Sequence, residues 1–586
     1  MLNSICVVRG MFLFNTFDEN LDKMKKQFLF TALLALAAGA NAQTTRVQVI
    51  HNCADLAADS VDVYLNGTIL LDNFAFRTAT PFVDVTAGSP ITLSVAPKNS
   101  TSVADTFFST TVTLDATRKY ILVANGIESA SGYSPAATSV PFRLSVTDIA
   151  RESAASSGNT DLLVMHGATD APVVDVRAGN TVLVNDIAFG QYNSTGYLPL
   201  PTADYIIDVT DATGGTVVKR YSAPLATWSL TGGAATIVAS GFLNPSVNSS
   251  GAPFGLWAAP AAGGALRQLD EVARVQVIHN CADRAADSVD IYLNGIRSFD
   301  NVAFRTNTSF FNAPVGTPIN IGIAPKSSTS VTDTFFNTTV TLTSDKRYIL
   351  VAQGIESATG YAPSASTVPF RLSVYTQGRE ISRASADTTD ILVVHGCTDA
   401  PAVDVRAGSA VLVNDITFGN FAGYLSLPTA NYTLDITDAP GTTTVARYSA
   451  PLSTLGLDGD AITVLASGFL DPTDNSSGSP FGLWVALPTA GALVPLPSVP
   501  VSVTGMSAGV TASVFPNPAT NTVTVRAANG TTMKKVWMTD ITGRTIAAKE
   551  ATNNAEFLIN TLSPGMYLMN VENNDGRVET IKVVKE

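Results

Sequence analysis

An internal duplication constrains this 586-residue chain more than any other feature. Residues 46–146 align without a gap to residues 274–374, at a constant offset of 228 positions, and stretches such as RVQVIHNCAD and VPFRLSV recur nearly unchanged. The segments that follow also match, since HGATDAPVVDVRAG at 166–179 returns as HGCTDAPAVDVRAG at 395–408. Fixed-period self-similarity indicates a repeat architecture, here a duplicated pair that we call A1-B1-A2-B2.

The A and B units resemble each other more distantly. Each opens with His-x-x-x-Asp and continues with Val-Asp-Val or Val-Asp-Ile. This predicts four related domains of about one hundred residues each, which is an ordinary domain size. Their predicted bounds are 46–148 for A1, 159–260 for B1, 274–376 for A2 and 388–488 for B2.

Each unit has the pattern of strands. In A1, alternating runs such as SVDVYL, ITLSVAP and KYILVAN are separated by Gly, Asn, Asp and Pro at spacings of about ten residues. No helical period persists for three turns after the leader described below. About seven short strands per unit are typical of an immunoglobulin-like sandwich, although the Cys…Trp…Cys core of antibody domains is missing. The predicted fold is all-β, with four tandem sandwiches.

The beginning of the chain has the pattern of a secretory signal peptide. From Met24 it reads MKKQFLFTALLALAAGANAQ, with two lysines, an apolar run and an A-x-A cleavage site at Ala40 and Ala42. We therefore expect a signal peptide over 24–42. Residues 1–23 are expected to be a start-site extension, a long natural n-region being the alternative. The apolar run is too short to cross a membrane, and no transmembrane segment is expected in the mature chain.

The charge balance excludes one class of partner. The formal net charge is −13 and the pI is about 4.8. Nucleic-acid binding requires Lys/Arg stripes that neutralise phosphates, and this chain has no basic run. We therefore expect no nucleic-acid partner.

The units resemble a known family. The stretches HGATDAPVVDVRAG and GYLPLPTADYIIDV in B1 look like domain-of-unknown-function family 4397, an Ig-like module of bacterial surface and secreted proteins. B1 and B2 match its Asp-Ala-Pro opening, whereas A1 and A2 are two residues longer there and lack the proline. The resemblance covers residues 46 to about 488. It implies a fold and a location but no activity.

After a Pro/Val/Gly linker at 489–510, the last unit, 511–586, no longer repeats the pattern. It resembles the type A C-terminal sorting domain of the type IX secretion system. The residues that carry this likeness are Pro516, Asn517, Pro518, Gly543, Gly565 and Tyr567. The resemblance implies a small β-sandwich that addresses the chain to the type IX machinery and is then removed. It also implies a Gram-negative Bacteroidetes-type envelope, with the product secreted or on the outer cell surface, commonly attached to surface polysaccharide.

The four histidines raise the question of a repeated site. In RVQVIH, the residues Val47, Val49 and His51 point to one strand face, so the histidine extends the core-facing row. Asp55 follows in the turn, where a carboxylate can accept from backbone amides or from the imidazole. We interpret the motif as a structural turn repeated four times. The residues concerned are His51, Asp55, His166, Asp170, His279, Asp283, His395 and Asp399.

A metal site is the alternative interpretation of these turns. Each unit offers one histidine and at most one cysteine, from Cys53, Cys281 and Cys397, whereas zinc requires three or four ligands. Calcium is favoured over zinc because Asp-rich turns such as 471–482 supply oxygens. With one cysteine at most in a unit, no internal disulfide is expected. The prediction is that the protein has no cofactor, with calcium left as the alternative.

Enzymatic signatures are missing from the sequence. It contains no G-x-S-x-G, H-E-x-x-H or Walker motif, and every histidine occupies the same repeated place. We therefore predict a non-enzymatic surface protein that binds or adheres to an unidentified ligand. The alternatives are a structural stalk or matrix component, and a carbohydrate-binding protein or glycoside hydrolase.

The predicted ligand loops are GIESASGYSPA and GIESATGYAPS. They carry Glu128, Tyr133, Glu356 and Tyr361. Surface polysaccharide or another cell-surface molecule is the expected partner. Trp257 and Trp484, at the end of each B unit, are expected to pack in the core or between domains.

Overall fold

The structure of the protein is a computed structural model. It describes residues 43–129, 131–357, 359–500, 512–528, 532–541, 543–574 and 578–586. The predicted signal peptide and its cleavage site, Ala40 and Ala42, lie outside these residues. The described chain is nearly all β and forms two compact units, one ending at Ser498 and one beginning at Val499. The predicted all-β fold of tandem sandwiches is confirmed.

Unit A1 is a sandwich of two sheets. One has the order β4-β1-β8-β9, with β5 also paired to β1, and the other has the order β3-β2-β6-β7. Between β2 and β3, Asn66 and Gly67 both have positive φ, as a type I′ hairpin turn requires. The strands are β1 (Thr44–His51), β2 (Ser60–Leu65), β3 (Thr68–Ala75), β4 (Thr78–Ala79), β5 (Val83–Thr86), β6 (Pro90–Pro97), β7 (Phe108–Thr113), β8 (Lys119–Asn125) and β9 (Arg143–Thr147).

Unit A2 repeats this arrangement. Its sheets have the orders β23-β20-β27-β28, with β24 on β20, and β22-β21-β25-β26. Its first strand begins four residues earlier than the predicted bound of 274. The strands are β20 (Asp270–His279), β21 (Ser288–Leu293), β22 (Ile296–Ala303), β23 (Thr306–Asn307), β24 (Phe311–Pro314), β25 (Pro318–Pro325), β26 (Phe336–Thr341), β27 (Arg347–Gln353) and β28 (Arg371–Tyr375). Short helices α2 (Pro135–Thr138) and α3 (Pro363–Ser366) precede β9 and β28.

The B units are sandwiches of the same kind. In B1 the sheets are β13-β10-β16-β17 and β12-β11-β14-β15, and in B2 they are β32-β29-β35-β36 and β31-β30-β33-β34. B1 consists of β10 (Asn159–His166), β11 (Val174–Ala178), β12 (Thr181–Ile187), β13 (Leu198–Pro201), β14 (Asp204–Asp211), β15 (Val217–Pro224), β16 (Ala234–Ser240) and β17 (Gly255–Pro260). B2 consists of β29 (Thr388–His395), β30 (Val403–Ala407), β31 (Ala410–Ile416), β32 (Phe421–Pro428), β33 (Asn431–Asp438), β34 (Thr444–Pro451), β35 (Ala461–Ser467) and β36 (Gly482–Ala486).

The first strand of each A unit is buried on both faces. In β1, Val47 points into the core of A1, whereas Ile50 belongs to an apolar layer that A1 shares with B1. Leu163 and Val238 supply the B1 side of that layer. A second layer of the same kind joins Ile278 of A2 to Leu392 of B2. The A and B units therefore form two fused pairs.

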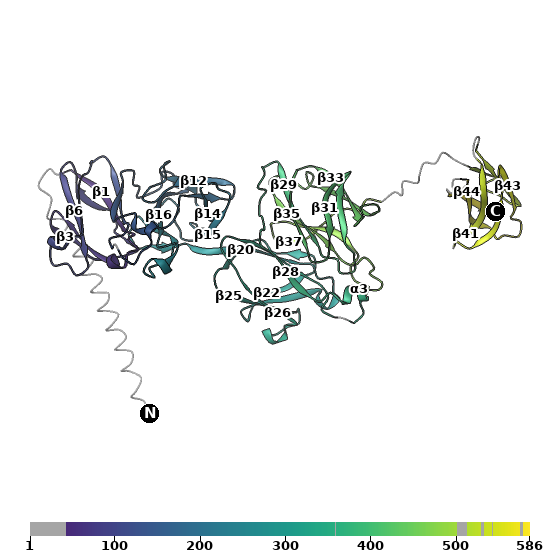
Figure 1. Ribbon diagram of the computed structural model, residues 1–586, viewed down its shortest axis with the longest axis horizontal. Helices are drawn as coiled ribbons and strands as arrows, with labels where there is room; N and C mark the ends of the chain where they lie inside the picture. Colours follow the sequence, from purple (N-terminus) through teal and green to yellow (C-terminus); the bar gives the residue numbers. More distant parts are fainter. Residues whose placement is uncertain are drawn as a thin grey trace, which may run out of the picture. The chain divides into compact units, whose positions relative to one another are not determined.

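The two pairs are also connected through a sheet. Strand β20 pairs with β15 of B1 at Tyr221↔Glu271 before it continues into A2, where it runs parallel to β27. Figure 1 shows β20 leaving β15 and entering A2 beside β28. The ten-stranded sheet that results includes strands of B1 and of A2. The B1–A2 connection is thus a continuation of a sheet instead of a free linker.

Short strands after each B unit return to the preceding A unit. β18 (Gly264–Ala265) pairs with β4 of A1, and β37 (Gly491–Ala492) pairs with β23 of A2. β19 (Arg267–Gln268) and β38 (Val494–Pro495) pair with the last strand of each B unit. The segment leaving each pair therefore closes the edge of its A sheet.

The C-terminal unit, described by itself, contains a three-stranded and a four-stranded sheet around one apolar core. The sheet orders are β39-β40-β43 and β42-β41-β44-β45. The strands are β39 (Ala512–Phe515), β40 (Thr522–Ala527), β41 (Met533–Asp540), β42 (Thr545–Glu550), β43 (Asn554–Leu558), β44 (Gly565–Asn573) and β45 (Val578–Lys585).

Candidate functional site

The histidine of each A unit lies at the end of the first strand and is fully buried. The Nε2 atom of His51 lies 2.8 Å from the carbonyl oxygen of Ala58, and its Nδ1 accepts from the Cys53 amide at 3.3 Å. Nε2 therefore carries the proton and the ring is neutral. Burial lowers the pKa of His51 to about 4, and its copy His279 has the same contacts and a pKa of about 4. A neutral ring with both nitrogens engaged has no proton-transfer role toward solvent.

The histidines of the B units are held by the turn that follows them. The Nε2 atoms of His166 and His395 lie 3.0 Å from the carbonyl oxygens of Pro172 and Pro401. Burial lowers the pKa of both rings. In all four units the histidine bonds a carbonyl of its own turn, so each ring links the strand end to that turn.

The aspartate of the motif does not bond its histidine but has a separate set of partners. Asp55 accepts from the amides of Glu128 and Ser129 at 2.9 and 2.7 Å and from the Tyr133 hydroxyl at 2.8 Å. Burial opposes ionisation, but these bonds outweigh it and lower the pKa of Asp55. The carboxylate therefore joins the turn after β1 to the loop after β8.

The other three aspartates repeat this bridging. Asp283 accepts from the amides of Glu356 and Ser357, as Asp55 does from their counterparts. In B1, Asp170 accepts from the amides of Leu243 and Asn244 and from the Asn248 side chain. In B2, Asp399 accepts from the amides of Leu470 and Asp471 and from the Asn475 side chain.

The two tyrosines predicted to bind a ligand belong to domain contacts. The ring of Tyr133 lies 5.6 Å from that of Phe242 in B1, and its hydroxyl is bonded to Asp55. Next to it, Ser249 of B1 donates to the carbonyl of Gly132 at 2.8 Å. Tyr361 repeats the arrangement against Phe469 and Asp283. Neither tyrosine is a free surface side chain.

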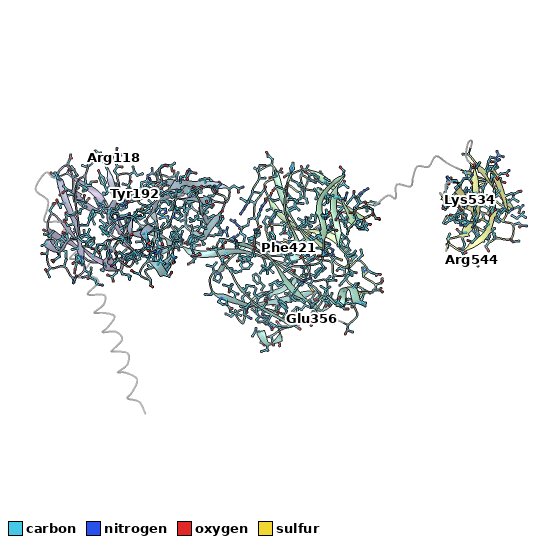
Figure 2. All side chains as sticks on the ribbon, in the orientation of Figure 1. Arg118, Tyr192, Glu356, Phe421, Lys534 and Arg544 are labelled. Carbon is cyan, nitrogen blue, oxygen red and sulfur yellow. The ribbon has the colours of Figure 1, made fainter. Side chains whose placement is uncertain are left out.

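Glu128 and Glu356 are the exposed members of the predicted ligand set. Figure 2 labels Glu356 on A2. Its backbone amide is bound by Asp283, so the loop is fixed while the carboxylate faces solvent. These two glutamates therefore remain available to a partner.

Polar side chains that the sequence did not single out hold each A unit to its B unit. Arg77 donates to the Ser240 hydroxyl and to the Pro253 carbonyl, at 3.0 and 2.8 Å, and lies over the Trp257 ring. Asn52 donates to the carbonyls of Gly167 and Ala239. We call the apolar layer and these polar contacts the A–B joint. The expectation that Trp257 packs between domains agrees with this geometry.

The second A–B joint is a copy of the first. Arg305 donates to Ser467 and Pro480 and lies over Trp484, and Asn280 donates to the Ala466 carbonyl. Aromatic side chains support both joints. They include Tyr192, which donates to the Ser145 carbonyl, and Phe421, 5.2 Å from Tyr375 (Figure 2). Arg77 and Asn52 recur in A2 at the offset of 228, but recurrence alone does not distinguish a contact between units from one within a unit.

A charged network joins B1 to A2. Asp208 accepts from Arg220 at 2.6 Å and from Arg347 of A2 at 3.0 Å. Arg220 also donates to the carbonyls of Ser344 and Lys346 in A2. Burial is the main cause that lowers the pKa of Arg220. A buried charge held this way requires both units in place, so the network fixes A2 against B1.

Cys53, Cys281 and Cys397 are buried, and none of these three thiols is poised for chemistry. The thiols of Cys53 and Cys281 donate to the carbonyls of Gly126 and Gly354, and Cys397 lies 3.1 Å from Asp399. Burial raises the pKa of the Cys53 thiol to about 12. Deprotonation of these thiols is therefore strongly disfavoured.

The described residues contain no group of three or more His, Cys, Asp or Glu side chains placed to hold a metal ion. In the loop proposed for calcium, Asp471 accepts from the amide and hydroxyl of Thr473. Its neighbour Asp399 is occupied by two backbone amides and Asn475. Calcium at 471–482 stays a hypothesis.

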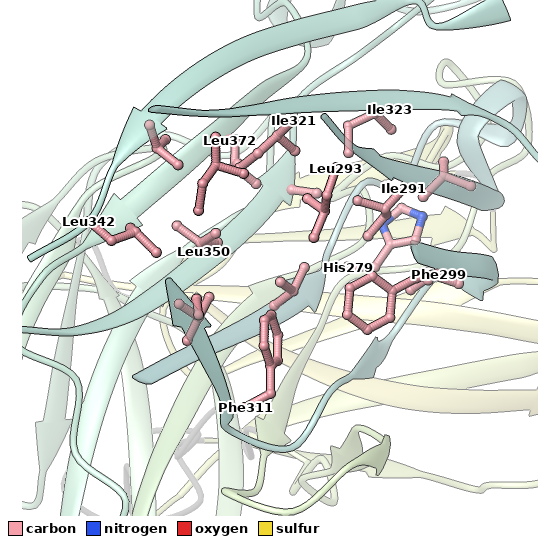
Figure 3. Close-up of a pocket in the computed structure, with 18 residues that line it drawn as sticks. His279, Ile291, Leu293, Phe299, Phe311, Ile321, Ile323, Leu342, Leu350 and Leu372 are labelled. Atoms are coloured by element: carbon pink, nitrogen blue, oxygen red, sulfur yellow. The ribbon is translucent and has the colours of Figure 1, made fainter. Parts of the chain in front are cut away.

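The core of A2 encloses an apolar cavity of about 50 Å³. Figure 3 shows His279 at one end of it, beside Ile291 and Phe299, with leucines and isoleucines of both sheets around the rest. Both His279 nitrogens are already bonded. Ligand pockets are usually hundreds of cubic ångströms in volume with convergent polar groups, so this cavity is a packing void between the sheets.

In the C-terminal unit, the predicted sorting residues surround the last strand. The Asn517 side chain donates to the Lys582 carbonyl at 2.6 Å and accepts from the Val584 amide at 2.8 Å, as a paired strand would. Pro516 and Pro518 flank it. Tyr567 donates to the Ser563 carbonyl, and Gly543 and Gly565 have positive φ. The Pro-Asn-Pro turn therefore closes the open edge of β45.

Comparison with known families decides what kind of chain this is. Residues 45–143, 273–369 and 389–476 match Domain of unknown function (DUF4397), and residues 513–586 match Secretion system C-terminal sorting domain. Three regions of the chain are therefore DUF4397 domains, and its C-terminal unit is a secretion-system sorting domain. Its sorting domain assigns it to the type IX secretion machinery and to the outer cell surface or the secreted fraction. No helix in the described part of the chain is long and apolar enough to cross a membrane.

Solved structures give only distant likenesses to this chain, and no curated protein matches it. SGBP-B of the Bacteroides ovatus mixed-linkage glucan utilization locus, in complex with a mixed-linkage heptasaccharide, is 10% identical with a TM-score of 0.11. The alignment covers 53% of this chain and 66% of that one, just under two thirds of its length. PorZ, a surface component of the type IX secretion system of Porphyromonas gingivalis, is 11% identical with a TM-score of 0.13, over 94% and 82% of the two chains.

Proposed function

We propose that the protein is a non-enzymatic spacer at the outer cell surface, built from two rigid A–B pairs. The observation that carries this proposal is the contact between Tyr133 and Asp55. Tyr133, which lies in one of the ligand loops predicted from the sequence, ties the turn of A1 to the loop that B1 covers. Residues that look like recognition residues are thus used to fix one domain against the next.

The connections support rigidity over the length of the four units. Both A–B joints have an apolar layer, a buried asparagine and an arginine over a tryptophan. B1 and A2 share a sheet, and Arg347 of A2 binds Asp208 of the buried Asp208–Arg220 pair of B1. Inter-domain motion is the default where interfaces are small and polar, and a shared apolar core opposes it.

B1 lies outside the matched regions, and we propose that it is a fourth unit of the same family. Its Asp170 accepts from two backbone amides and from Asn248, as Asp399 does with Asn475 in the matched unit B2. His166 bonds the carbonyl of Pro172 at the same distance as His395 bonds that of Pro401. Four equivalent units give two equivalent pairs.

Adhesion is the second candidate, and one observation favours it. The turns at the A1–B1 joint present apolar side chains to solvent, Leu56 beside Asp55 and Leu243 beside Phe242, with Glu128 also exposed. Exposed apolar residues with a nearby charge are common in protein-binding surfaces. An adhesive partner, protein or surface polysaccharide, would contact these side chains.

The experiment that tests the spacer function compares the bacterium producing the whole protein with one whose chain lacks the second pair, residues 270–497. A spacer predicts that the surface layer becomes thinner in electron micrographs of sections. The variant that combines Glu128→Ala, Leu56→Ser and Leu243→Ser is the matched control that removes these adhesive candidates and preserves length. A layer that keeps its thickness after the deletion, together with glycan or cell binding lost in the control variant, would replace the spacer function by adhesion.

A further inference from the structure

The interface between B1 and A2 is formed by charged side chains from both units. B2 has counterparts of the B1 side chains, and A1 has counterparts of the A2 side chains. On the B1 side, Asp208 and Arg220 form a pair in which the Arg220 side chain is 1% exposed. On the A2 side, Arg347 binds Asp208 and is 13% exposed. Glu380 and Arg274 continue the network behind Arg347.

B2 carries the B1 side of this interface with nothing docked on it in the described chain. Asp435 and Arg447 stand at the positions of Asp208 and Arg220, and they form the same pair at 2.5 Å. The Arg447 side chain is 31% exposed. We call Asp435 and Arg447 the tail face.

A1 carries the A2 side, also uncovered. Lys119 stands where A2 has Arg347, and its Nζ binds Glu152 at 2.8 Å while the side chain is 46% exposed. Arg46 completes the set at 2.8 Å from the other oxygen of Glu152. We call Arg46, Lys119 and Glu152 the head face. Arg118, next to it, is labelled in Figure 2 on A1.

The backbone at the tail face is in the same register as at the B1–A2 connection. Tyr448 pairs with Ser498 as Tyr221 pairs with Glu271 in B1, and the Ser449 amide donates to the Pro497 carbonyl. The chain's own residues thus take the place of the start of β20. The side chains of Asp435 and Arg447 remain uncovered, so another molecule can contact them.

We propose that the head face of a second copy of this chain docks on the tail face, so that copies associate end to end. Asp435 would accept from Lys119 of that copy, and Arg447 would donate to the carbonyls of Ala116 and Arg118, which stand where A2 has Ser344 and Lys346. Opposite charges meet, since the tail offers a carboxylate where the head offers an ammonium group. A head-to-tail contact that does not close into a ring extends without limit. The inference deepens the proposed spacer function and rests on it for its purpose, a surface fibre or matrix.

The contact between copies is weaker than the one inside the chain. The internal interface includes an ion pair between Lys219 and Glu271 and a bond from Asn180 to the Ser382 carbonyl. B2 has Ala446 and Ser409 at the positions of Lys219 and Asn180. We therefore expect association that depends on concentration and salt.

The test is sedimentation velocity of the protein as recovered from culture, up to a concentration on the order of 1 mM. We expect species heavier than a monomer, whose association constant falls at least about tenfold between about 50 and 500 mM salt. Asp435→Lys alone and Lys119→Asp alone each place like charges together, and each reduces association at least tenfold. In an equimolar mixture, the head face of each variant meets the tail face of the other with opposite charges. Association is then regained. Lys98→Asp, the same charge change elsewhere on A1, has no effect.

Several results would overturn the inference: a monomer at every concentration, single variants that associate as the parent does, or a mixture that does not recover. Melting temperatures of the variants are measured first, so that unfolding is not mistaken for lost docking. The spacer function is tested separately by small-angle scattering of the same monomers. Rigid monomers that do not associate leave the spacer function standing, whereas independently moving A and B units overturn that function itself.

Discussion

The guanidinium of Arg77 lies 4.1 Å from the centre of the Trp257 ring, so a side chain of A1 covers an aromatic ring of B1. The same guanidinium donates to Ser240 and Pro253, and burial lowers its pKa to about 10. Arg305 and Trp484 repeat the distance in the second pair. One chain therefore contains two copies of the joint, and each can serve as the control for the other.

Arg77→Ala is expected to loosen the first A–B joint alone. The variant loses a desolvated cation–π contact and leaves the Pro253 carbonyl unpaired, together a cost of about 2–3 kcal/mol. Hydrogen exchange should then accelerate in β1 and β10 but not in β20 and β29. Arg305→Ala should reverse that pattern. Equal exchange in both pairs of either variant would show that the arginine does not hold the joint.

Asp55→Ala is expected to destabilise A1 by about 2 kcal/mol or more. It leaves the amides of Glu128 and Ser129 and the Tyr133 hydroxyl without their acceptor, and unpaired buried donors carry the full cost of desolvation. Denaturant unfolding followed by tyrosine fluorescence measures the change. Asp72→Ala, which removes an exposed carboxylate, is the matched control and should change stability little. If the two variants unfold alike, the bridging role of Asp55 is wrong.

Acid is expected to weaken the A units between about pH 6.5 and pH 4. The folded pKa of His51 and of His279 is about 4, below the unfolded value of about 6.5, so the unfolded chain binds more protons in this range. Stability is complete above pH 6.5 and falls by up to about 3 kcal/mol per histidine as the pH drops to 4. His51→Gln, which keeps a donor toward Ala58, should flatten the profile for A1 only. A parent protein whose stability is constant over this range contradicts the assignment.

Chelation is expected to leave the melting temperature unchanged. The carboxylates of the repeated turns already accept hydrogen bonds from backbone amides, which would have to be broken for an ion to bind. Thermal melting with and without chelator, together with elemental analysis, measures this. Stoichiometric calcium and a lower melting temperature after chelation would instead identify 471–482 as an ion site.

Asn517→Ala is expected to release the end of β45 and to reduce export. The variant loses both bonds by which the side chain closes the edge of that strand. Proteolysis of the C-terminus and the fraction of protein reaching the culture medium are the readouts. Asn554→Ala, at an exposed position of β43, is the control. If export stays normal while the C-terminus is proteolysed, the secretion machinery recognises this unit without the closed end of β45.

The sequence was informative wherever a pattern is local. Alternation in SVDVYL predicts a strand whose valines point inward, and Val61 and Val63 are buried in the A1 core. The duplication predicts the repeated turns. These features depend on residues within one strand or turn, so a single sequence contains the whole signal.

Contacts between units could not be predicted in the same way. Ile50 has the parity of an outward-facing residue in an isolated sandwich, and nothing local distinguishes solvent from a neighbouring domain as its environment. Tyr133 stands in a Gly/Ser-rich loop of the kind that usually carries recognition residues, although it packs on Phe242 far along the chain. Such pairs are brought together by the domain arrangement, which hydrophobic periodicity does not encode.

The pairing of β18 with β4 has a consequence for the order in which the protein acquires its structure. A1 is synthesised and exported before B1, yet the edge of its first sheet is completed only by Gly264 and Ala265, which follow the whole of B1. The side-chain amide of Gln48 likewise gains its bond to the Pro260 carbonyl only after B1 has been made. A chain that lacks the segment after B1 therefore leaves this edge of A1 open, so the A1 sheet is completed only when the whole A1–B1 pair is present.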